Sequence, residues 1–119
     1  MSIRVLIVDD HASFRRLAAR LLTEAGFAIV GEAADGASAL RETARLRPDV
    51  VLLDLVLPDG SGLQLASDLV RTAAPPRVVL TSSRSRSDFG VSFDWPAGCR
   101  FVPKHALTAA RFRAALQLP

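Results

Sequence analysis

Short apolar runs alternate along the chain with segments in which apolar residues recur every three or four positions. The first run, residues 3–8, is almost continuously apolar and rich in β-branched residues, which is typical of a strand buried on both faces. In the segment that follows, the apolar residues fall on one face of a helix, and Gly26 marks its end. These residues are Phe14, Leu17, Ala18, Leu21 and Leu22.

The same alternation continues to the end of the chain. A fourth helical segment, Ser87–Trp95, has the weakest pattern because Gly90 lies inside it and Pro96 ends it. Five strands that alternate with helical segments predict right-handed βαβ units and an α/β fold with a mostly parallel sheet. The other strands are predicted over residues 27–33, 50–54, 77–81 and 100–103, a turn over 57–62, and helices over 37–44, 63–73 and 109–116.

The length and composition indicate one ordinary globular domain, residues 1–119, with half of its residues hydrophobic. No apolar stretch approaches the length of a membrane span, and the first strand is too short for a signal peptide. The single cysteine, Cys99, cannot form an internal disulfide, which fits a reducing compartment. We therefore expect a cytoplasmic protein.

The charge pattern argues against direct nucleic-acid binding. The net charge is only +3, and the arginines are spread along the chain rather than clustered on one face. The small clusters are interpreted as solvated helix faces; they are Arg15/Arg16, Arg84/Arg86 and Arg111/Arg113. Fourteen of the fifteen basic residues are Arg, so the one Lys, Lys104, indicates a position that needs a compact point charge rather than a planar fork.

Polar residues follow the predicted buried strands. Asp9 and Asp10 come after the first strand, Asp54 ends the third, Thr81 ends the fourth and Lys104 follows the fifth. The carboxyl ends of parallel strands meet at one edge of a sheet, so these side chains are predicted to converge. Three carboxylates repel one another unless a cation holds them, and Mg²⁺ with Lys and Thr would form a cradle for a phosphoryl group. In that cradle Asp54 could be the nucleophile that forms an aspartyl-phosphate.

Each of these residues also has a simpler interpretation. Asp9 and Asp10 could cap the first helix, although a cap needs only one Asp. Thr81 could be an ordinary β-branched strand residue. His11 is more easily a helix-start residue than a ligand, since Mg²⁺ prefers oxygen. His105 and Cys99 show no partner spacing and are interpreted as structural.

Four sequence runs, in this order and spacing, resemble the receiver domain of two-component response regulators, the CheY-like superfamily. They are residues 5–11 (VLIVDDH), 48–60 (PDVVLLDLVLPDG), 80–82 (LTS) and 101–104 (FVPK). The resemblance covers essentially the whole chain. It implies a doubly wound (βα)5, flavodoxin-like, three-layer sandwich whose parallel sheet has the strand order 2-1-3-4-5.

The resemblance also implies roles for individual residues. Asp54 would be the phosphoacceptor. Mg²⁺ would be held by Asp54, by Asp10 directly, by Asp9 mainly through water, and by the backbone carbonyl of Val56. Two side chains would bind the phosphoryl group, and two would form the switch. The phosphoryl-binding pair is Thr81 and Lys104, and the switch pair is Thr81 and Phe101, although Phe101 fits a core position equally well.

The implied partners are a sensor histidine kinase or phosphotransfer protein as donor, and an output domain or partner protein as target. The target would bind the face formed by Ser87–Trp95, the fifth strand and the last helix. The runs around Asp59 and Lys104 resemble receivers normally joined to a helix-turn-helix output, which suggests transcription regulation. Such a domain would catalyse only its own phosphorylation and dephosphorylation, so we expect no turnover enzyme.

Two other functions are considered. A degenerate receiver would dock a partner without phosphorylation, which the intact set of acids and Lys104 argues against. A phosphatase of the haloacid-dehalogenase type would need an acid two residues after its nucleophile, where this chain has Val56.

One departure from the family concerns the loop after the fifth strand. A proline joined by a cis bond often follows the lysine in the family, but here His105 follows Lys104 and Pro103 precedes it. A cis bond before a non-proline residue costs about 3–4 kcal/mol, so we assume none. Pro103 suits the edge of a sheet, where the implied strand order puts the fifth strand.

Overall fold

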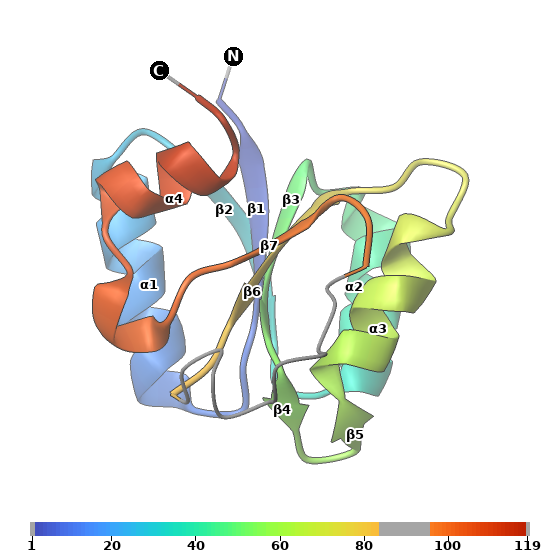
Figure 1. Cartoon of the computed structure of the whole chain (residues 1–119). Helices are drawn as coiled ribbons and strands as arrows, with labels where there is room; N and C mark the ends of the chain where they lie inside the picture. The colour runs from blue at the N-terminus through green and yellow to red at the C-terminus, as the bar shows by residue number, and fades with distance from the viewer. Residues whose placement is uncertain (1, 84–95, 119) are drawn as a thin grey trace.

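The computed structural model describes residues 2–83 and 96–118 of the chain. Its core is a five-stranded sheet in the order β2-β1-β3-β6-β7, and every neighbouring pair is parallel (Figure 1). Counted along the predicted strands this is the order 2-1-3-4-5, so the expected flavodoxin-like α/β fold is confirmed. The strands are β1 (Arg4–Val8), β2 (Ala28–Ala33), β3 (Val50–Asp54), β6 (Arg77–Thr81) and β7 (Cys99–Phe101).

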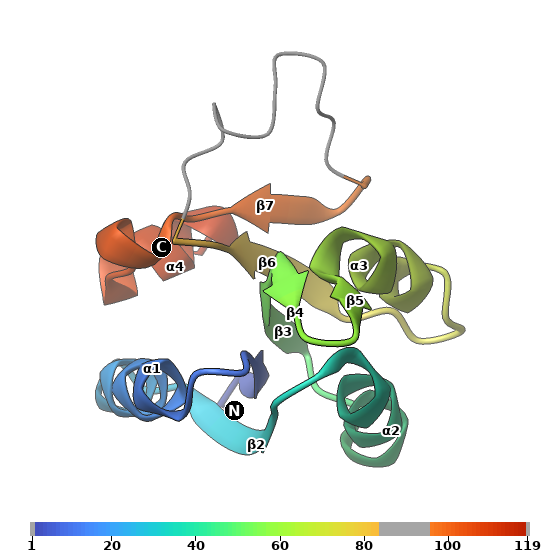
Figure 2. The same ribbon diagram turned by 90° about the horizontal axis from the view of Figure 1, so that it is seen from below.

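Helices cover both faces of the sheet. Helices α1 and α4 lie on one face, and α2 and α3 lie on the other (Figures 1 and 2). The predicted helical segment Ser87–Trp95 lies outside the described residues. The described helices are α1 (Ala12–Glu24), α2 (Gly36–Leu46), α3 (Gly62–Val70), α4 (Ala109–Ala115) and a 3-10 turn, η2 (Lys104–Ala106).

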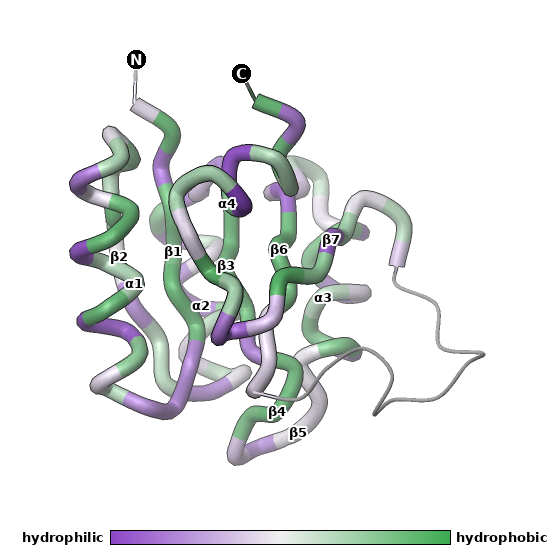
Figure 3. The backbone as a smooth tube through the Cα atoms, turned by 60° about the vertical axis from the view of Figure 1, so that its left-hand side comes forward, coloured by the Kyte–Doolittle hydropathy of each residue, from purple (hydrophilic) through white to green (hydrophobic). Residues whose placement is uncertain are grey.

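Two hydrophobic cores fill the space between the sheet and its helices. Along β1, Val5 and Ile7 pack under α1 and α4, whereas Leu6 and Val8 pack under α2 and α3. Every residue of β3 is buried, as its unbroken apolar run predicted (Figure 3). Burying each apolar side chain of the strand stabilises the fold by roughly 1.5–3 kcal/mol, so the central strands form the rigid part of the structure.

Helix α1 buries a narrower stripe than its sequence pattern predicted. Ala18 and Leu22 are buried, but Leu17 is 58% exposed. The helix packs on β1 and β2 at one edge of the sheet, so the sheet does not extend under the whole apolar face. Leu17 thus belongs to the apolar face that the sequence pattern indicates but lies outside the core.

The predicted ends of α3 and β7 also need correction. Helix α3 stops at Val70 rather than near residue 73, because the Thr72 hydroxyl donates a hydrogen bond to the Leu69 carbonyl at 2.8 Å and closes the helix. Strand β7 covers Cys99–Phe101 rather than residues 100–103, although the amides of Val102 and Lys104 still donate hydrogen bonds to the carbonyls of Leu80 and Ser82. Strand β7 does lie at the edge of the sheet, where a neighbouring proline is tolerated.

The predicted turn over residues 57–62 contains a small antiparallel hairpin. Its strands are β4 (Val56–Leu57) and β5 (Gly60–Ser61), and the connecting Asp59 accepts hydrogen bonds from the amides of Gly36 and Ala37 at the start of α2. Figure 1 shows that the carboxyl ends of the five parallel strands lie at the pole that carries this hairpin. The two termini lie at the opposite pole. Within the described ranges, none of the helices is both long and apolar enough to cross a bilayer.

Gly62 provides a test of how tightly the hairpin and α3 are joined to β3. A Cβ atom on Gly62 would lie 2.0 Å from the backbone oxygen of Asp54, and that oxygen cannot move without moving β3. We expect Gly62→Ala to lower the free energy of unfolding by about 2 kcal/mol or more, measured by urea denaturation.

Gly36→Ala is the matched control because Gly36 also begins a helix. Its Cβ atom would meet only the side chain of Asp59, at 3.2 Å. The control should change stability by less than about 1 kcal/mol. An equal loss of stability in both variants would contradict the close approach at Gly62.

Candidate functional site

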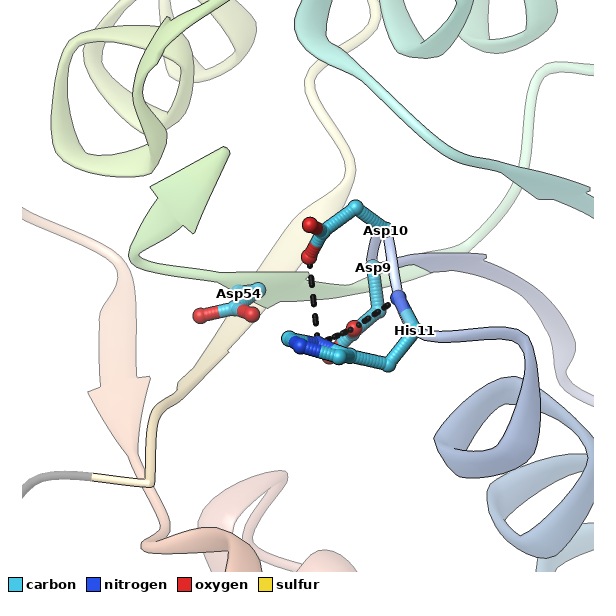
Figure 4. A group of neighbouring side chains, drawn as sticks. All are labelled: Asp9, Asp10, His11 and Asp54. Carbon is cyan, nitrogen blue, oxygen red and sulfur yellow. Dashed lines mark hydrogen bonds and ion pairs between the residues drawn. The ribbon is translucent and has the colours of Figure 1, made fainter. Parts of the chain in front are cut away.

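The residues predicted at the strand ends meet at one pole of the sheet. Asp9 and Asp10 follow β1, Asp54 ends β3, Thr81 ends β6, and Lys104 begins η2. Asp54 and Thr81 are register partners in neighbouring strands. Figure 4 shows the side chains of Asp9, Asp10 and Asp54 turned toward one another.

Lys104 joins the two buried carboxylates. Its Nζ lies 2.7 Å from Oδ2 of Asp9 and 3.1 Å from Oδ2 of Asp54. Asp9 is fully buried and Asp54 is only 3% exposed. The ammonium also lies 4.6 Å from the centre of the Phe14 ring, close enough for a cation–π contact. A slim ammonium can reach both acids at once, which is a physical reason for Lys rather than Arg at this position.

Backbone groups hold the remaining carboxylate oxygens. Oδ1 of Asp54 accepts a hydrogen bond from the Val56 amide at 3.0 Å, and Oδ1 of Asp9 accepts one from the His11 amide at 2.8 Å. The guanidinium of Arg15 donates to the Asp9 carbonyl at 2.6 Å. Each acid is therefore fixed by its own chain as well as by Lys104.

The pKa directions of the two acids differ although they share Lys104. Burial opposes ionisation of Asp9, but its hydrogen bonds with Lys104 and His11 outweigh burial and lower its pKa. Burial raises the pKa of Asp54, and the Val56 amide and the charge of Lys104 only partly offset it. The pKa of Lys104 is raised because its two carboxylate partners outweigh the effect of burial. Asp54 is thus the more basic of the two carboxylates.

The donor set fits a hard divalent cation. Asp9, Asp10, His11 and Asp54 each offer a ligand atom, and these atoms lie within 4.8 Å of one another. Carboxylate oxygens are the ligands that Mg²⁺ prefers, at about 2.0–2.1 Å. A pocket of 280 Å³ opens beside them, and its lining includes Asp10, Asp54, Val56 and Lys104.

The side chain of Thr81 brings a hydroxyl group to the site that forms no hydrogen bond in the described structure. Its Oγ1 is fully buried and has no hydrogen-bond partner among residues 2–83 and 96–118. Such a buried hydroxyl costs free energy unless a ligand satisfies it. Phe101 is half-buried at the end of β7, where it packs against the core under α2 and α3.

The structure contradicts the simpler interpretation of Asp9 and Asp10 as helix caps and confirms that of His11 as a helix-start residue. Neither Asp9 nor Asp10 is the N-cap of α1; that residue is His11, as its helix-start interpretation predicted. Cys99 is buried in the core, and His105 is exposed. The described residues contain no cis peptide bond, so the bond between Lys104 and His105 is trans.

Sequence reasoning missed two residues that contact this site. Phe14 was interpreted only as a core residue, and Arg15 only as part of a solvated cluster. The ring of Phe14 lies against the ammonium of Lys104, and Arg15 holds the Asp9 carbonyl while its Nε donates to Glu32 at 3.0 Å. Their positions in the first turn of the helix after the acids are the only signal that could have found them.

The raised pKa of Asp54 leads to a stability prediction. Above its folded-state pKa the ionised carboxylate is less favourable in the folded chain than in the unfolded chain. Asp54→Asn should therefore raise the free energy of unfolding at neutral pH. The gain should disappear as the pH falls below the ordinary Asp value of about 4, where the acid is protonated in both states.

Urea denaturation in magnesium-free buffer at both pH values measures this effect. Asp68→Asn is the control, since Asp68 is an exposed acid on α3. A wild-type chain at least as stable as Asp54→Asn at neutral pH would contradict the prediction.

The chain is similar to parts of proteins that are named as enzymes and as transcription regulators. It is 49% identical over 82 residues to protein-glutamate methylesterase/protein-glutamine glutaminase 5 of Myxococcus xanthus, a match that covers 68% of this chain and 24% of the relative. It is 37% identical over 82 residues to the transcriptional regulatory protein LiaR of Bacillus subtilis, covering 68% of this chain and 39% of LiaR. The chain thus spans about a quarter of the methylesterase relative's length.

A solved structure and a family match agree with these relatives. The signal receiver domain of the response regulator NarL from Mycobacterium tuberculosis superposes with a TM-score of 0.75 at 31% identity, covering 97% of both chains. Residues 5–113 match the family described as the response regulator receiver domain. The chain therefore belongs to the response regulator receiver domains of two-component signalling.

Proposed function

We propose that residues 1–119 form one receiver domain that accepts a phosphoryl group on Asp54 in a Mg²⁺-dependent reaction. The donor is a phosphohistidine on a sensor histidine kinase or a phosphotransfer protein. The observation that carries this proposal is the buried Asp54 carboxylate, whose Oδ2 lies 3.1 Å from the only lysine of the chain. Phosphorylation changes the conformation and so controls an output domain or a partner protein.

The chain's own groups prepare Asp54 as a nucleophile. A carboxylate oxygen of Asp54 bonds to phosphorus while the P–N bond to the donor imidazole breaks, and that bond's electron pair stays on the imidazole nitrogen. The raised pKa keeps the carboxylate basic, and the Val56 amide fixes its orientation. Lys104 then pairs with the phosphoryl oxygens. Asp9, Asp10, Asp54 and the Val56 carbonyl would hold Mg²⁺, whose positive charge would neutralise those oxygens.

Thr81 and Phe101 form the switch. The buried, unpartnered hydroxyl of Thr81 is a donor for a phosphoryl oxygen on its register partner Asp54. Movement of Thr81 toward that group frees space near the end of β6, beside the half-buried Phe101 of the neighbouring strand β7. The change of charge at Asp54 is thereby converted into a change of shape at the β7 edge of the sheet.

The output remains a separate part of the proposal. The similarity to LiaR supports transcription regulation as the setting, and the location that we propose is the cytoplasm. The methylesterase relatives carry their activity in whole proteins of which this chain matches about a quarter. For the domain itself we propose only self-catalysed phosphorylation and dephosphorylation, not turnover of another substrate.

The competing functions are less well supported. The ion pairs of Lys104 with both acids are intact, which disfavours a receiver that only docks a partner. Val56 offers no acid two residues after Asp54, and the family match is to receivers rather than to phosphatases.

Incubation with acetyl phosphate or phosphoramidate and Mg²⁺ tests the proposed chemistry. We expect a mass gain of one phosphate that is labile as an acyl phosphate, requires Mg²⁺ and is absent in Asp54→Asn. Asp68→Asn should be phosphorylated like the wild type. A missing gain, or one that survives Asp54→Asn, would sink the proposal.

Thr81→Val separates the role of the hydroxyl from that of the strand. Valine keeps the shape of Thr81 and removes an unpartnered buried hydroxyl, so the unphosphorylated chain should be as stable as the wild type or up to about 1 kcal/mol more stable. The phosphorylated form should lose its hydrogen bond, with the steady-state phosphorylated fraction falling several-fold. Urea denaturation and mass spectrometry measure the two effects.

Thr43→Val is the comparison, because the buried Thr43 hydroxyl donates to the Ala39 carbonyl at 2.7 Å. It should lose about 1 kcal/mol of stability without a specific loss of phosphorylation. A Thr81→Val chain with undiminished phosphorylation would exclude the proposed contact.

A further inference from the structure

His11 lies beside the acidic site in a way that its role as a helix-start residue does not explain. It is the N-cap residue of α1, yet its side chain forms no capping hydrogen bond. The imidazole instead turns back toward the acids, as Figure 4 shows. Its Nδ1 forms a hydrogen bond of 3.0 Å with Oδ1 of Asp9 and lies 3.1 Å from Oδ1 of Asp10.

These separations match those between adjacent ligands of one metal ion. Two ligand atoms at about 2.0–2.1 Å from a metal, at octahedral or tetrahedral angles, lie about 2.9–3.4 Å apart. The nitrogen of His11 and one oxygen from each of Asp9 and Asp10 therefore already have the spacing of one face of a coordination shell. Asp54 completes the group within 4.8 Å.

The imidazole is also accessible to an ion that enters from solvent. The His11 side chain is 64% exposed, and His11 lines the same pocket as Asp10, Asp54 and Lys104. The buried hydroxyl of Thr81, the register partner of Asp54, has no hydrogen-bond partner in the described structure. A cation in the pocket would thus meet one nitrogen and several oxygens.

A nitrogen ligand changes which ions a site prefers. Mg²⁺ gains little from imidazole because it is a hard ion that selects oxygen. Zn²⁺, Ni²⁺ and related borderline ions bind imidazole well, and their affinity for mixed nitrogen and oxygen sites rises along the first-row series toward copper. His11 should therefore raise the affinity for such ions without much effect on Mg²⁺.

The geometry points to His11 as a nitrogen ligand that allows this site to hold a borderline transition-metal ion, together with Asp9 and Asp10, as an alternative to Mg²⁺. The inference rests on the proposed metal site of the receiver and adds a residue and a class of ion to it. Since the two kinds of ion would share carboxylates, transition-metal ions should compete with Mg²⁺.

Calorimetric titration of the untagged full chain with NiCl2 and, separately, with MgCl2 tests the inference. The variant is His11→Asn, because Asn is a favoured N-cap residue and preserves the start of α1. In buffer at about pH 7.5, we expect the Ni²⁺ affinity to fall at least about tenfold and the Mg²⁺ affinity to change less than about twofold.

His105→Asn is the matched control, since His105 is the only other histidine and is exposed. It should leave both affinities unchanged, and the buried Cys99 should not compete for Ni²⁺. An unchanged Ni²⁺ affinity in His11→Asn, or an equal fall for Ni²⁺ and Mg²⁺, would overturn the inference.

The outcome is distinguishable from that of the proposed function. Phosphorylation of Asp54 with Mg²⁺ and an unchanged Ni²⁺ affinity in His11→Asn would leave the receiver chemistry standing and remove His11 as a ligand. A selective loss of Ni²⁺ affinity in a chain that does not phosphorylate would support the ligand and refute the receiver chemistry.

Discussion

The ion pairs of Lys104 with Asp9 and Asp54 are the interaction on which the arrangement of the strand ends depends. Val8 and Leu53 are register partners in β1 and β3, so the acids that follow them, Asp9 and Asp54, lie side by side. Two buried carboxylates at this spacing repel each other unless a cation lies between them. One ammonium that contacts both acids makes their burial tolerable. It also links the segment after β7, at the sheet edge, to the ends of β1 and β3.

The rest of the fold holds this charged pole on a rigid base. Strand β3 is buried throughout, and the backbone of α3 at Gly62 approaches the Asp54 carbonyl so closely that no side chain fits between them. Asp59 ties the hairpin after Asp54 to the start of α2. Asp54 is therefore fixed from several directions, whereas Lys104 follows an edge strand of three residues. A new charge on Asp54 would be answered mainly by movement on the β7 side of the sheet.

Relatives of this chain are named as methylesterases and as transcription regulators, and each matches about two thirds of it. The proposed phosphoryl switch would need only the acids, the lysine and a surface that changes shape, so it would suit more than one kind of output. Residues beside these acids, such as His11, would alter the metal site without removing that chemistry. The pocket is open to solvent at Asp10 and His11, so an ion that enters it would contact the side chain at position 11.

The sequence by itself determined the strands, their polar ends and the residues gathered there, because uninterrupted apolar runs mark buried parallel strands whose carboxyl ends meet at one edge. Resemblance to a known family added the strand order. Only the tertiary structure decided that Lys104 contacts both acids, that His11 turns back onto them, that Arg15 anchors Asp9 and that Leu17 lies outside the core. These outcomes depend on side-chain directions and loop closures between distant segments. Lys104 and Asp54 are separated by 50 positions, and no local pattern encodes their distance.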